Sequence, residues 1–390
     1  MMISPLNVLQ LLLQLLLIIR SSSSLSPPPP PPPTVLVTGG AGYIGSHTCL
    51  SLLTSGTSLV VYDDLSNSSP ESLSRVSKIV SASTKTPGKV HFRLGDIRDS
   101  TTLNSVLSEF PSLRTCVHFA GLKAVGESSS VPLKYYDVNI RGTINLLKCL
   151  ETHDVPNVVF SSSATVYGDP EILPIPENAP LKSTNPYGRT KLFVEELLRD
   201  LYTSSPDFWN ILILRYFNPI GAHPSGLIGE DPKGIPNNLM PFVSQVCVGR
   251  REEVSVFGGD YETEDGTGVR DYIHVVDLAR GHKDAIEKLE KGKVGCEAVN
   301  LGTGKGFSVL DLINGMGEAT GKPVPYTVVG RRPGDVASCY CDPTKAEELL
   351  GWKAEKGLKD CCDDSWRWQV NNPEGYGEYV EEEKVLKSEN

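Results

Sequence analysis

Tyr187 and Lys191 are the residues whose types and spacing first suggest catalysis. They lie in Asn185–Lys191, which reads Asn-Pro-Tyr-Gly-Arg-Thr-Lys and opens a predicted helix. Residues four apart share one helical face, and none of the other tyrosines has a lysine at this offset. A nearby ammonium lowers the pKa of a phenol, so Tyr187 can act as a general base. A surface tyrosine beside a solvated lysine has the same spacing, so the pair alone leaves both interpretations open.

Ser163 adds a third group to this pair. It closes the apolar run Asn157–Phe160 and the serines that follow it, about one β-α unit before Tyr187. A hydroxyl at that place can hydrogen-bond the same substrate oxygen that Tyr187 contacts. Together the three residues predict a site of proton transfer.

A glycine-rich turn predicts a cofactor site. The apolar run Thr34–Thr38 leads into Gly39-Gly-Ala-Gly-Tyr-Ile-Gly45 and then into the helical pattern Ser46–Leu53. In a strand, turn and helix of this kind, backbone N–H groups and the helix N-terminus face a pyrophosphate. Gly42 leaves room for the phosphates, and Gly45 lets the helix pack on the strand.

Asp63 indicates which dinucleotide would bind. It ends a second apolar run, Ser58–Tyr62, about twenty residues after Gly42, where a carboxylate accepts both ribose hydroxyls of NAD and repels a 2′-phosphate. The cationic nicotinamide of NAD would also lower the pKa of Tyr187. A turn-capping role for Asp63 is the alternative, and adjacent Asp64 leaves open which carboxylate binds the ribose.

Further apolar runs alternate with helical patterns and predict the fold. These runs are Lys89–Leu94, Thr115–Phe119, Asn157–Phe160 and Asn210–Leu214. Helices are predicted between them, as in Asn145–Thr152 and Tyr187–Tyr202, whereas the serine-rich stretch Ser77–Gly88 is expected to be a surface loop. The alternation predicts a Rossmann-like, doubly wound parallel α/β sheet that binds ligands at the carboxyl ends of its strands.

Composition excludes several classes of protein. A chain of 390 residues with 39% hydrophobic and 22% charged residues is typical of one or two globular domains. The net charge of -10, without a basic block, argues against nucleic-acid binding. Nine cysteines without regular spacing argue against a disulfide framework and a metal site, and for a reducing, cytoplasmic location.

Ser163, Tyr187 and Lys191 behind a glycine-rich NAD turn resemble the extended branch of the short-chain dehydrogenase/reductase superfamily. Longer blocks resemble the UDP-glucose 4-epimerase family over roughly residues 34–368. These blocks are Thr38–His47, His118–Ser128, Ser161–Gly168, Arg215–His223, Asn237–Pro241 and Asp265–His274. The resemblance implies an NAD-binding Rossmann domain over 34–217, a smaller C-terminal α/β domain for a UDP-sugar over 218–370 with some interleaving of the chain, and a homodimer.

The resemblance also assigns binding residues. Those expected around NAD are Gly39, Gly42, Tyr43, Ile44, Gly45, Asp63, Asp64, Asp96, Ile97, Phe119, Ala120, Lys123, Asn139, Tyr187, Lys191 and Phe217. Those expected at the UDP-sugar are Lys123, Ser163, Asn218, Asn238, Leu239, Phe257, Arg270, Arg332, Asp335 and Cys339. Arginine suits a pyrophosphate because its guanidinium binds phosphate oxygens in pairs, and both arginines are expected in glycine-flanked loops.

The implied reaction is the reversible 4-epimerisation of UDP-glucose and UDP-galactose, a step of galactose metabolism. Since C4 carries no acidic proton, the family oxidises it transiently to a 4-keto sugar with tightly bound NAD. Tyr187 would accept the 4-hydroxyl proton, Ser163 would hold the oxygen, and Lys191 would tune Tyr187 and bind the nicotinamide ribose. Cys339 stands where relatives carry either a bulky aromatic or a small residue, which extends the expected substrates to UDP-N-acetylhexosamines.

Three other functions stay open. A nucleotide-sugar 4,6-dehydratase or decarboxylase needs an extra acid just after the catalytic serine, where this chain has Ala164 and Thr165. A UDP-arabinose/UDP-xylose 4-epimerase is the main alternative, because some carry a hydrophobic N-terminal anchor and Leu9–Ile19 is apolar. A non-enzymatic NAD-sensing scaffold would dispense with Tyr187 and Lys191.

Both ends of the chain are expected to lie outside the fold. Residues 1–33 join the apolar Leu9–Ile19, a run of serines and the prolines Pro27–Pro33, which cannot enter a core. The apolar run is short for a membrane span, so we expect a targeting signal, a short anchor or a dispensable segment. Residues 371–390 form an acidic tail, and no membrane contact is expected for the folded domain.

Overall fold

The computed structural model of the protein describes residues 34–377 except Pro333. The predicted N-terminal appendage, residues 1–33, and residues 378–390 of the predicted acidic tail lie outside the described residues. In the described part of the chain, no helix is both long and apolar enough to cross a membrane.

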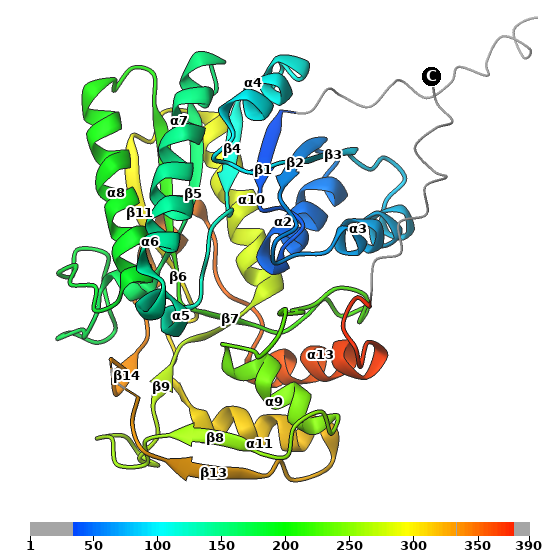
Figure 1. Ribbon diagram of the computed structural model, residues 1–390, viewed down its shortest axis with the longest axis vertical. Helices are drawn as coiled ribbons and strands as arrows, with labels where there is room; N and C mark the ends of the chain where they lie inside the picture. The colour runs from blue at the N-terminus through cyan, green and yellow to red at the C-terminus, as the bar shows by residue number, and fades with distance from the viewer. Residues whose placement is uncertain (1–33, 333, 378–390) are drawn as a thin grey trace, which may run out of the picture. The chain divides into compact units, whose positions relative to one another are not determined.

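Seven parallel strands form the central sheet (Figure 1). They are β1 (Val35–Thr38), β2 (Leu59–Asp63), β3 (Val90–Leu94), β4 (Thr115–His118), β5 (Asn157–Ser163), β6 (Asn210–Tyr216) and β11 (Cys296–Leu301). Their order is β11-β6-β5-β4-β1-β2-β3, so the direction of winding reverses between β1 and β4. The Rossmann-like prediction is confirmed, and ligands of such sheets bind at this switch point.

The strands alternate between two apolar cores because successive side chains point to opposite faces. Val35 and Val37 pack with one set of helices, and Leu36 packs with the other. The first set is α2 (Tyr43–Thr54), α3 (Pro70–Ser83) and α10 (Val275–Lys291). The second set is α4 (Ser100–Glu109), α7 (Gly142–Thr152) and α8 (Pro186–Ser204). Helices therefore cover both faces of the sheet (Figure 1).

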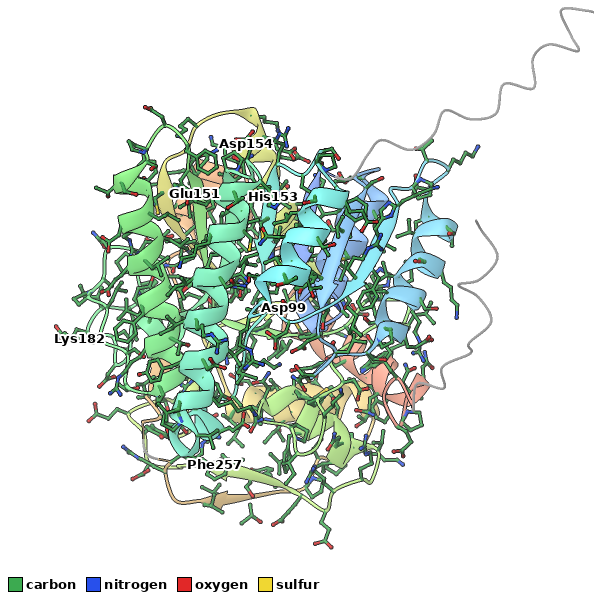
Figure 2. The ribbon with its side chains drawn as sticks, turned by 45° about the horizontal axis from the view of Figure 1, so that its top comes forward. Asp99, Glu151, His153, Asp154, Lys182 and Phe257 are labelled. Carbon is green, nitrogen blue, oxygen red and sulfur yellow. The ribbon has the colours of Figure 1, made fainter. Side chains whose placement is uncertain are left out.

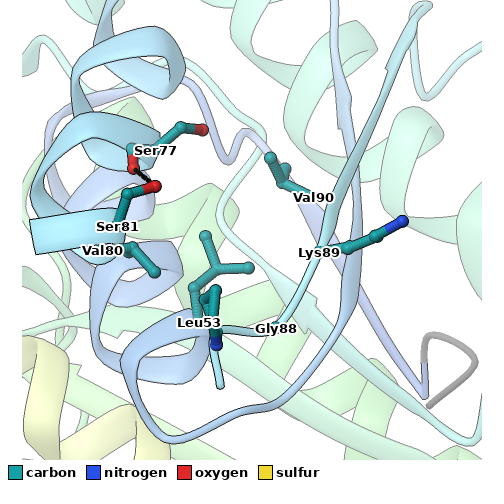
Figure 3. Close-up of a pocket in the computed structure, with 8 residues that line it drawn as sticks. Leu53, Ser77, Val80, Ser81, Gly88, Lys89 and Val90 are labelled. Atoms are coloured by element: carbon teal, nitrogen blue, oxygen red, sulfur yellow. Dashed lines mark hydrogen bonds between the residues drawn. The ribbon is translucent and has the colours of Figure 1, made fainter. Parts of the chain in front are cut away.

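The loop expected at Ser77–Gly88 is wrong for its first half, where α3 continues to Ser83. Val76 and Val80 are one helical turn apart and are buried in the core. Each serine hydroxyl donates to a carbonyl one turn earlier, as Ser81 Oγ does to Ser77 O at 2.9 Å (Figure 3). Buried valines thus keep a serine-rich sequence helical, and Val80 lines one pocket with Leu53 (Figure 3).

A smaller set of elements surrounds a third core. It contains α9 (Leu239–Cys247), β8 (Val254–Phe257), α11 (Val309–Thr320), β13 (Tyr326–Val329) and α13 (Leu358–Asn371). Three short strands form a separate sheet in the order β12 (Phe307–Ser308), β9 (Val269–Arg270) and β14 (Ser338–Cys339). β7 (Asn218–Ile220) pairs with β10 (Tyr272–His274). Between these elements the chain returns to the large sheet through α10 and β11, and α12 (Thr344–Leu350) packs against β11.

Four short elements complete the edge of the sheet where the site lies. They are α5 (Val125–Ser130), α6 (Pro132–Tyr135), the π-helix η1 (Tyr136–Arg141) and the 3-10 helix η2 (Ala164–Val166). η1 carries Asn139 directly into α7, and η2 follows Ser163. π-helical turns are frequent at functional sites because they displace one side chain from the regular helical register.

Candidate active site

The end of β5 and the start of α8 bring Ser163, Tyr187 and Lys191 together. α8 begins at Pro186, whose fixed φ suits the first helical position, and the Asn185 side chain caps the backbone N–H of Gly188 at 2.9 Å. Ser163 is the last residue of β5 and hydrogen-bonds Tyr187. The predicted serine and tyrosine are therefore direct partners.

Hydrogen bonds around Ser163 orient its hydroxyl toward Tyr187. The Ser163 oxygen accepts the backbone N–H of Thr165 at 3.2 Å, and the Thr165 hydroxyl lies 3.0 Å away as a second donor. The hydrogen of Ser163 is then left for the Tyr187 oxygen. Such a donor stabilises a phenolate, or an alkoxide-like substrate oxygen at the same place.

Burial and a hydrogen bond have opposite effects on the pKa of Tyr187, whereas the predicted lowering by Lys191 together with a nicotinamide stays a prediction. Burial raises the pKa of Tyr187 to about 12, and the hydrogen bond from Ser163 only partly opposes this rise. The Lys191 ammonium lies 5.9 Å from the centre of the Tyr187 ring and instead donates to the backbone oxygen of Ser161 at 2.6 Å. Burial also lowers the pKa of Lys191 to about 7.

The glycine turn fits a dinucleotide. Gly39 has a φ of 72°, and a Cβ on Gly45 would lie 2.3 Å from the Gly39 oxygen, so both positions need glycine. α2 starts after Gly42 without any side-chain cap. The N–H groups of its first turn, including those of Tyr43 and Ile44, therefore suit the phosphates of NAD.

The structure separates the two adjacent carboxylates. Asp63 is buried and accepts the backbone N–H of Ala41 in the glycine turn at 2.9 Å. Burial raises the pKa of Asp63, and its hydrogen bonds oppose the rise. Asp64 is exposed and accepts the backbone N–H of Ser66 in a local turn at 2.9 Å. Asp63 is thus the carboxylate that lies against the turn.

The other residues predicted around NAD follow the carboxyl ends of strands or lie beside them. Asp96 and Ile97 follow β3, Phe119, Ala120 and Lys123 follow β4, and Phe217 follows β6. Arg98 pairs with Asp96 and lowers the pKa of that carboxyl group. Asn139 in η1 donates its amide hydrogens to Leu122 O at 3.0 Å and Thr190 Oγ1 at 2.9 Å, so it braces the β4 loop against α8.

Glu230 links the two predicted sets of binding residues, and it was not predicted from the sequence. Its carboxylate accepts the Lys123 ammonium at 2.7 Å and the Asn238 amide at 2.9 Å. The Glu230 side chain is only 9% exposed. No local sequence pattern distinguishes Glu230 from the other acidic residues. Lys123 lies far from it in the sequence, and Asn238 follows it in the same loop.

The residues predicted at the UDP-sugar fall into two groups in the smaller set of elements. Arg332 stacks over Phe257 with its guanidinium 4.5 Å from the ring centre, and its Nε donates to Asp335 at 3.0 Å. Phe257 ends β8, away from the large sheet (Figure 2). Arg270 lies in β9, so its expected position in a loop is wrong, and it pairs in register with Cys339 of β14.

Asn218, Leu239 and Cys339 connect these groups to the sheet. Asn218 begins β7 directly after Phe217, and Leu239 begins α9 next to Asn238. Cys339 packs on the cluster that contains Phe217, and burial raises its pKa to about 11. The carboxyl edge of β5 and β6 is thereby continuous with β14 and β9.

Comparisons with known proteins place the chain in a family. A sequence profile described as "GDP-mannose 4,6 dehydratase" matches residues 36–365. A UDP-glucose 4-epimerase of Bacillus subtilis is 57% identical over 341 residues, which cover 87% of this chain and 98% of the relative. The chain belongs to the UDP-glucose 4-epimerase family. Within that family, the crystal structure of the Bifidobacterium longum UDP-glucose 4-epimerase, in complex with NAD+ and UDP, is 52% identical, has a TM-score of 0.83, and covers 88% of this chain and 99% of its own.

A second epimerase structure gives a similar result. The UDP-glucose 4-epimerase of Stenotrophomonas maltophila, with bound NAD and formylated UDP-arabinopyranose, is 47% identical with a TM-score of 0.83 over 87% of this chain and 98% of its own. The profile carries the name of a dehydratase, and a dehydratase needs an acid just after the catalytic serine. In this chain Ala164 and Thr165 of η2 follow Ser163 instead. Membership of the epimerase family therefore agrees with the lack of an acidic residue at these two positions.

Proposed function

We propose that the protein interconverts UDP-glucose and UDP-galactose by inverting C4 of the hexose, with NAD retained as a cofactor. The observation that carries this proposal is the hydrogen-bonded pair of Ser163 and Tyr187 beside Lys191, at the sheet edge that the glycine turn also faces. NAD, which the glycine turn and Asp63 would hold, would supply reversible hydride transfer with C4 of the sugar. The enzyme is then an isomerase with no net redox change.

Chain residues move the proton and hold the oxygen. Tyr187 removes the 4-hydroxyl proton during oxidation and gives it back during reduction, and Ser163 donates a hydrogen bond to the same oxygen. Because burial raises the pKa of Tyr187 to about 12, positive charge must reach it before it can act as a base at neutral pH. The Lys191 ammonium and the cationic nicotinamide ring would supply that charge.

The cofactor and the nucleotide would be held at separate places. Gly39, Gly42, Gly45 and the N-terminus of α2 suit the pyrophosphate of NAD, and Asp63 suits its adenosine ribose. Arg270 and Arg332 would bind the diphosphate of the substrate, and Asn238 and Phe257 would contact its uridine. UDP would stay anchored while the 4-keto sugar rotates between the oxidation and the reduction, so remote binding energy positions C4.

We further propose that UDP-N-acetylhexosamines are substrates. Cys339 is a small side chain beside Arg270, and the neighbouring Tyr340 ring lies against Gly306, where a Cβ would be 3.1 Å from it. Tyr340 therefore has a partner of its own rather than filling space at Cys339. An N-acetyl group at C2 of the sugar needs that space.

The proposal includes a homodimer and a reducing compartment. Leu133 on α6 and Phe193 on α8 are 81% and 44% exposed, and the Tyr136 and Phe193 rings lie 6.4 Å apart, so exposed apolar side chains on these two helices would suit a second copy. All nine cysteines lie in the described part and are free thiols, which favours the cytoplasm. Sedimentation of Phe193→Asp should give monomers, and a dimeric variant would contradict this surface.

Product identification tests the proposed reaction directly. The full chain is incubated with UDP-galactose, UDP-N-acetylgalactosamine and UDP-arabinose, each with and without added NAD. We expect UDP-glucose and UDP-N-acetylglucosamine as products, with little dependence on added NAD because the cofactor is retained. UDP-xylose as the dominant product would favour a pentose epimerase, and loss of water from any sugar would favour a dehydratase.

A further inference from the structure

A chain of buried hydrogen bonds starts at Lys191 and runs away from the substrate. Lys191 Nζ lies 3.2 Å from Ser161 Oγ, and Ser161 hydrogen-bonds the hydroxyl of Tyr216. The Tyr216 hydroxyl in turn contacts Nε2 of His282, and Nδ1 of His282 lies 2.8 Å from the backbone oxygen of Leu278. None of the three residues between Lys191 and Leu278 belongs to the predicted catalytic set.

The last bond fixes the direction of all the others. A backbone oxygen only accepts, so Nδ1 of His282 must carry the hydrogen. Burial lowers the pKa of His282 to about 4, so the ring is neutral at pH 7 and Nε2 is an acceptor. Tyr216 must then donate to His282 and accept from Ser161, and Ser161 must accept from Lys191. Every hydroxyl in the chain points away from the active site.

The chain passes from one face of the sheet to the other. Lys191 comes from α8, Ser161 and Tyr216 from the neighbouring strands β5 and β6, and His282 from α10. Tyr216 is 7% exposed and His282 is fully buried, with their ring centres 5.2 Å apart. The low local dielectric strengthens aligned hydrogen bonds and makes a misaligned one costly.

We propose that Tyr216 and His282 are positioning residues that keep the Ser161 hydroxyl oriented as an acceptor for the Lys191 ammonium. This inference rests on the catalytic role proposed for Lys191. Without the acceptor at His282, the Tyr216 hydroxyl would turn toward Ser161 and compete with Lys191 for the same oxygen. Lys191 would then be less well held and more easily deprotonated.

The other ionisable groups around Lys191 leave its acceptor at Ser161 unchanged. His118 on β4 hydrogen-bonds Thr38 and Thr143, and burial lowers its pKa to about 3, so it stays neutral near pH 7. Tyr187 lies on the same helix, and burial raises its pKa to about 12. Glu195, one turn further along α8, pairs with Arg215. The hydrogen-bond acceptor of Lys191 whose orientation depends on His282 is therefore the Ser161 hydroxyl.

Replacement of His282 by leucine and by glutamine separates positioning from packing. Leucine fills space without an acceptor, whereas the glutamine side-chain oxygen can accept from Tyr216 near the place of Nε2. For His282→Leu we expect kcat for UDP-galactose to fall about 3- to 10-fold at unchanged KM, because one polarised hydrogen bond is lost. Its alkaline limb of kcat should move about half a pH unit to lower pH, since Lys191 loses its proton more readily.

Tyr216→Phe lacks the hydroxyl that would compete with Lys191 for Ser161 Oγ, so it should stay closer to wild type than His282→Leu, and His282→Gln should restore both kcat and the pH profile. NAD content and the thermal midpoint are measured for each variant. A wild-type profile in His282→Leu would overturn the inference, as would a Tyr216→Phe variant more impaired than His282→Leu or a His282→Gln variant as impaired as His282→Leu. Lys191→Met is the reference: if it retains activity, the proposed role of Lys191 fails, whereas an inactive Lys191→Met beside a normal His282→Leu removes only the positioning chain.

Discussion

The sheet and the smaller set of elements hold their parts of the site in different ways. Ser163 ends a strand of seven residues, and Tyr187 and Lys191 lie in a helix of nineteen. Beneath them Arg215 and Glu195 form an ion pair with side chains 1% and 0% exposed. In contrast, β9 and β14 are two residues long, and the Arg332 side chain is 54% exposed.

The difference teaches how the two tasks are divided. Proton and hydride transfer require reacting atoms at nearly fixed distances, which long packed elements provide. Diphosphate binding would tolerate adjustment, and Arg332, the residue proposed for it, pairs with Asp335 in its own loop. Substitutions in the sheet should therefore change kcat or stability, and substitutions in the short strands should change KM or substrate range.

The largest effect is expected for Tyr187→Phe. The ring and its packing remain, but the oxygen that transfers the proton is lost, so kcat should fall about 10²- to 10⁴-fold. KM for UDP-galactose and the NAD content should stay near their wild-type values. A loss of less than about 3-fold would exclude Tyr187 as the base.

The second-largest effect is expected for acidic pH, which should lower the free energy of unfolding. Burial lowers the pKa of His47 and His118 to about 3 and that of His282 to about 4, and all three lie on elements of the sheet layers. Between pH 6.5 and 4 the unfolded chain binds protons that the folded chain does not, so each histidine removes about 1.4 kcal/mol per pH unit from the free energy of unfolding.

Urea unfolding at pH 7 and pH 5 measures this loss. His118→Gln is the matched variant, because glutamine cannot be protonated and should reduce the difference between the two pH values. Equal stability of the wild type at pH 7 and pH 5 would show that these histidines titrate in the folded state.

Arg332→Ala should act mainly on binding. One guanidinium contact with the diphosphate is lost, so KM for UDP-galactose should rise about 10- to 100-fold while kcat changes less than about 3-fold. Arg331→Ala is the matched control, because Arg331 pairs with Asp260 and stacks on Tyr261 instead. A similar rise in KM in both variants would indicate a general loss of positive charge rather than a specific contact.

Cys339→Tyr should have the smallest effect on hexose turnover. The added ring takes space next to Arg270, which costs about 1–3 kcal/mol if the space is filled, so UDP-galactose turnover should stay within about 10-fold. Activity on UDP-N-acetylgalactosamine should disappear, whereas Cys339→Ser should retain both. A wild-type enzyme inactive on UDP-N-acetylgalactosamine would disprove the open space at Cys339.

The local sequence predicted the part of the site on the large sheet far better than the part in the smaller set of elements. The glycine turn and the spacing of Tyr187 and Lys191 are local patterns, and six of the strands could be recognised from apolar runs. β11 was not predicted, because it reads Cys-Glu-Ala-Val-Asn-Leu and joins the sheet from beyond α10. The two-residue strand of Arg270 exists only through its neighbours, so no periodicity could reveal it.

Properties that depend on burial in the tertiary structure could not be predicted from the local sequence either. The high pKa of Tyr187 follows from packing around it, and the spacing to Lys191 suggested the opposite direction. Glu230 contacts Lys123 across 107 positions, and His282 contacts Tyr216 across 66. Neither pair has a local pattern, although each joins elements that the fold brings together.

The late arrival of β11 has a consequence for synthesis on the ribosome. β6 is buried along its whole length in the finished protein and pairs with β11, which lies roughly 85 residues later. At about 5–20 residues per second, β6 would present an unpaired apolar edge for about 4–17 s while the intervening segment is made. Holding chaperones that shield strand edges should therefore raise the yield of this enzyme more than agents that act after release.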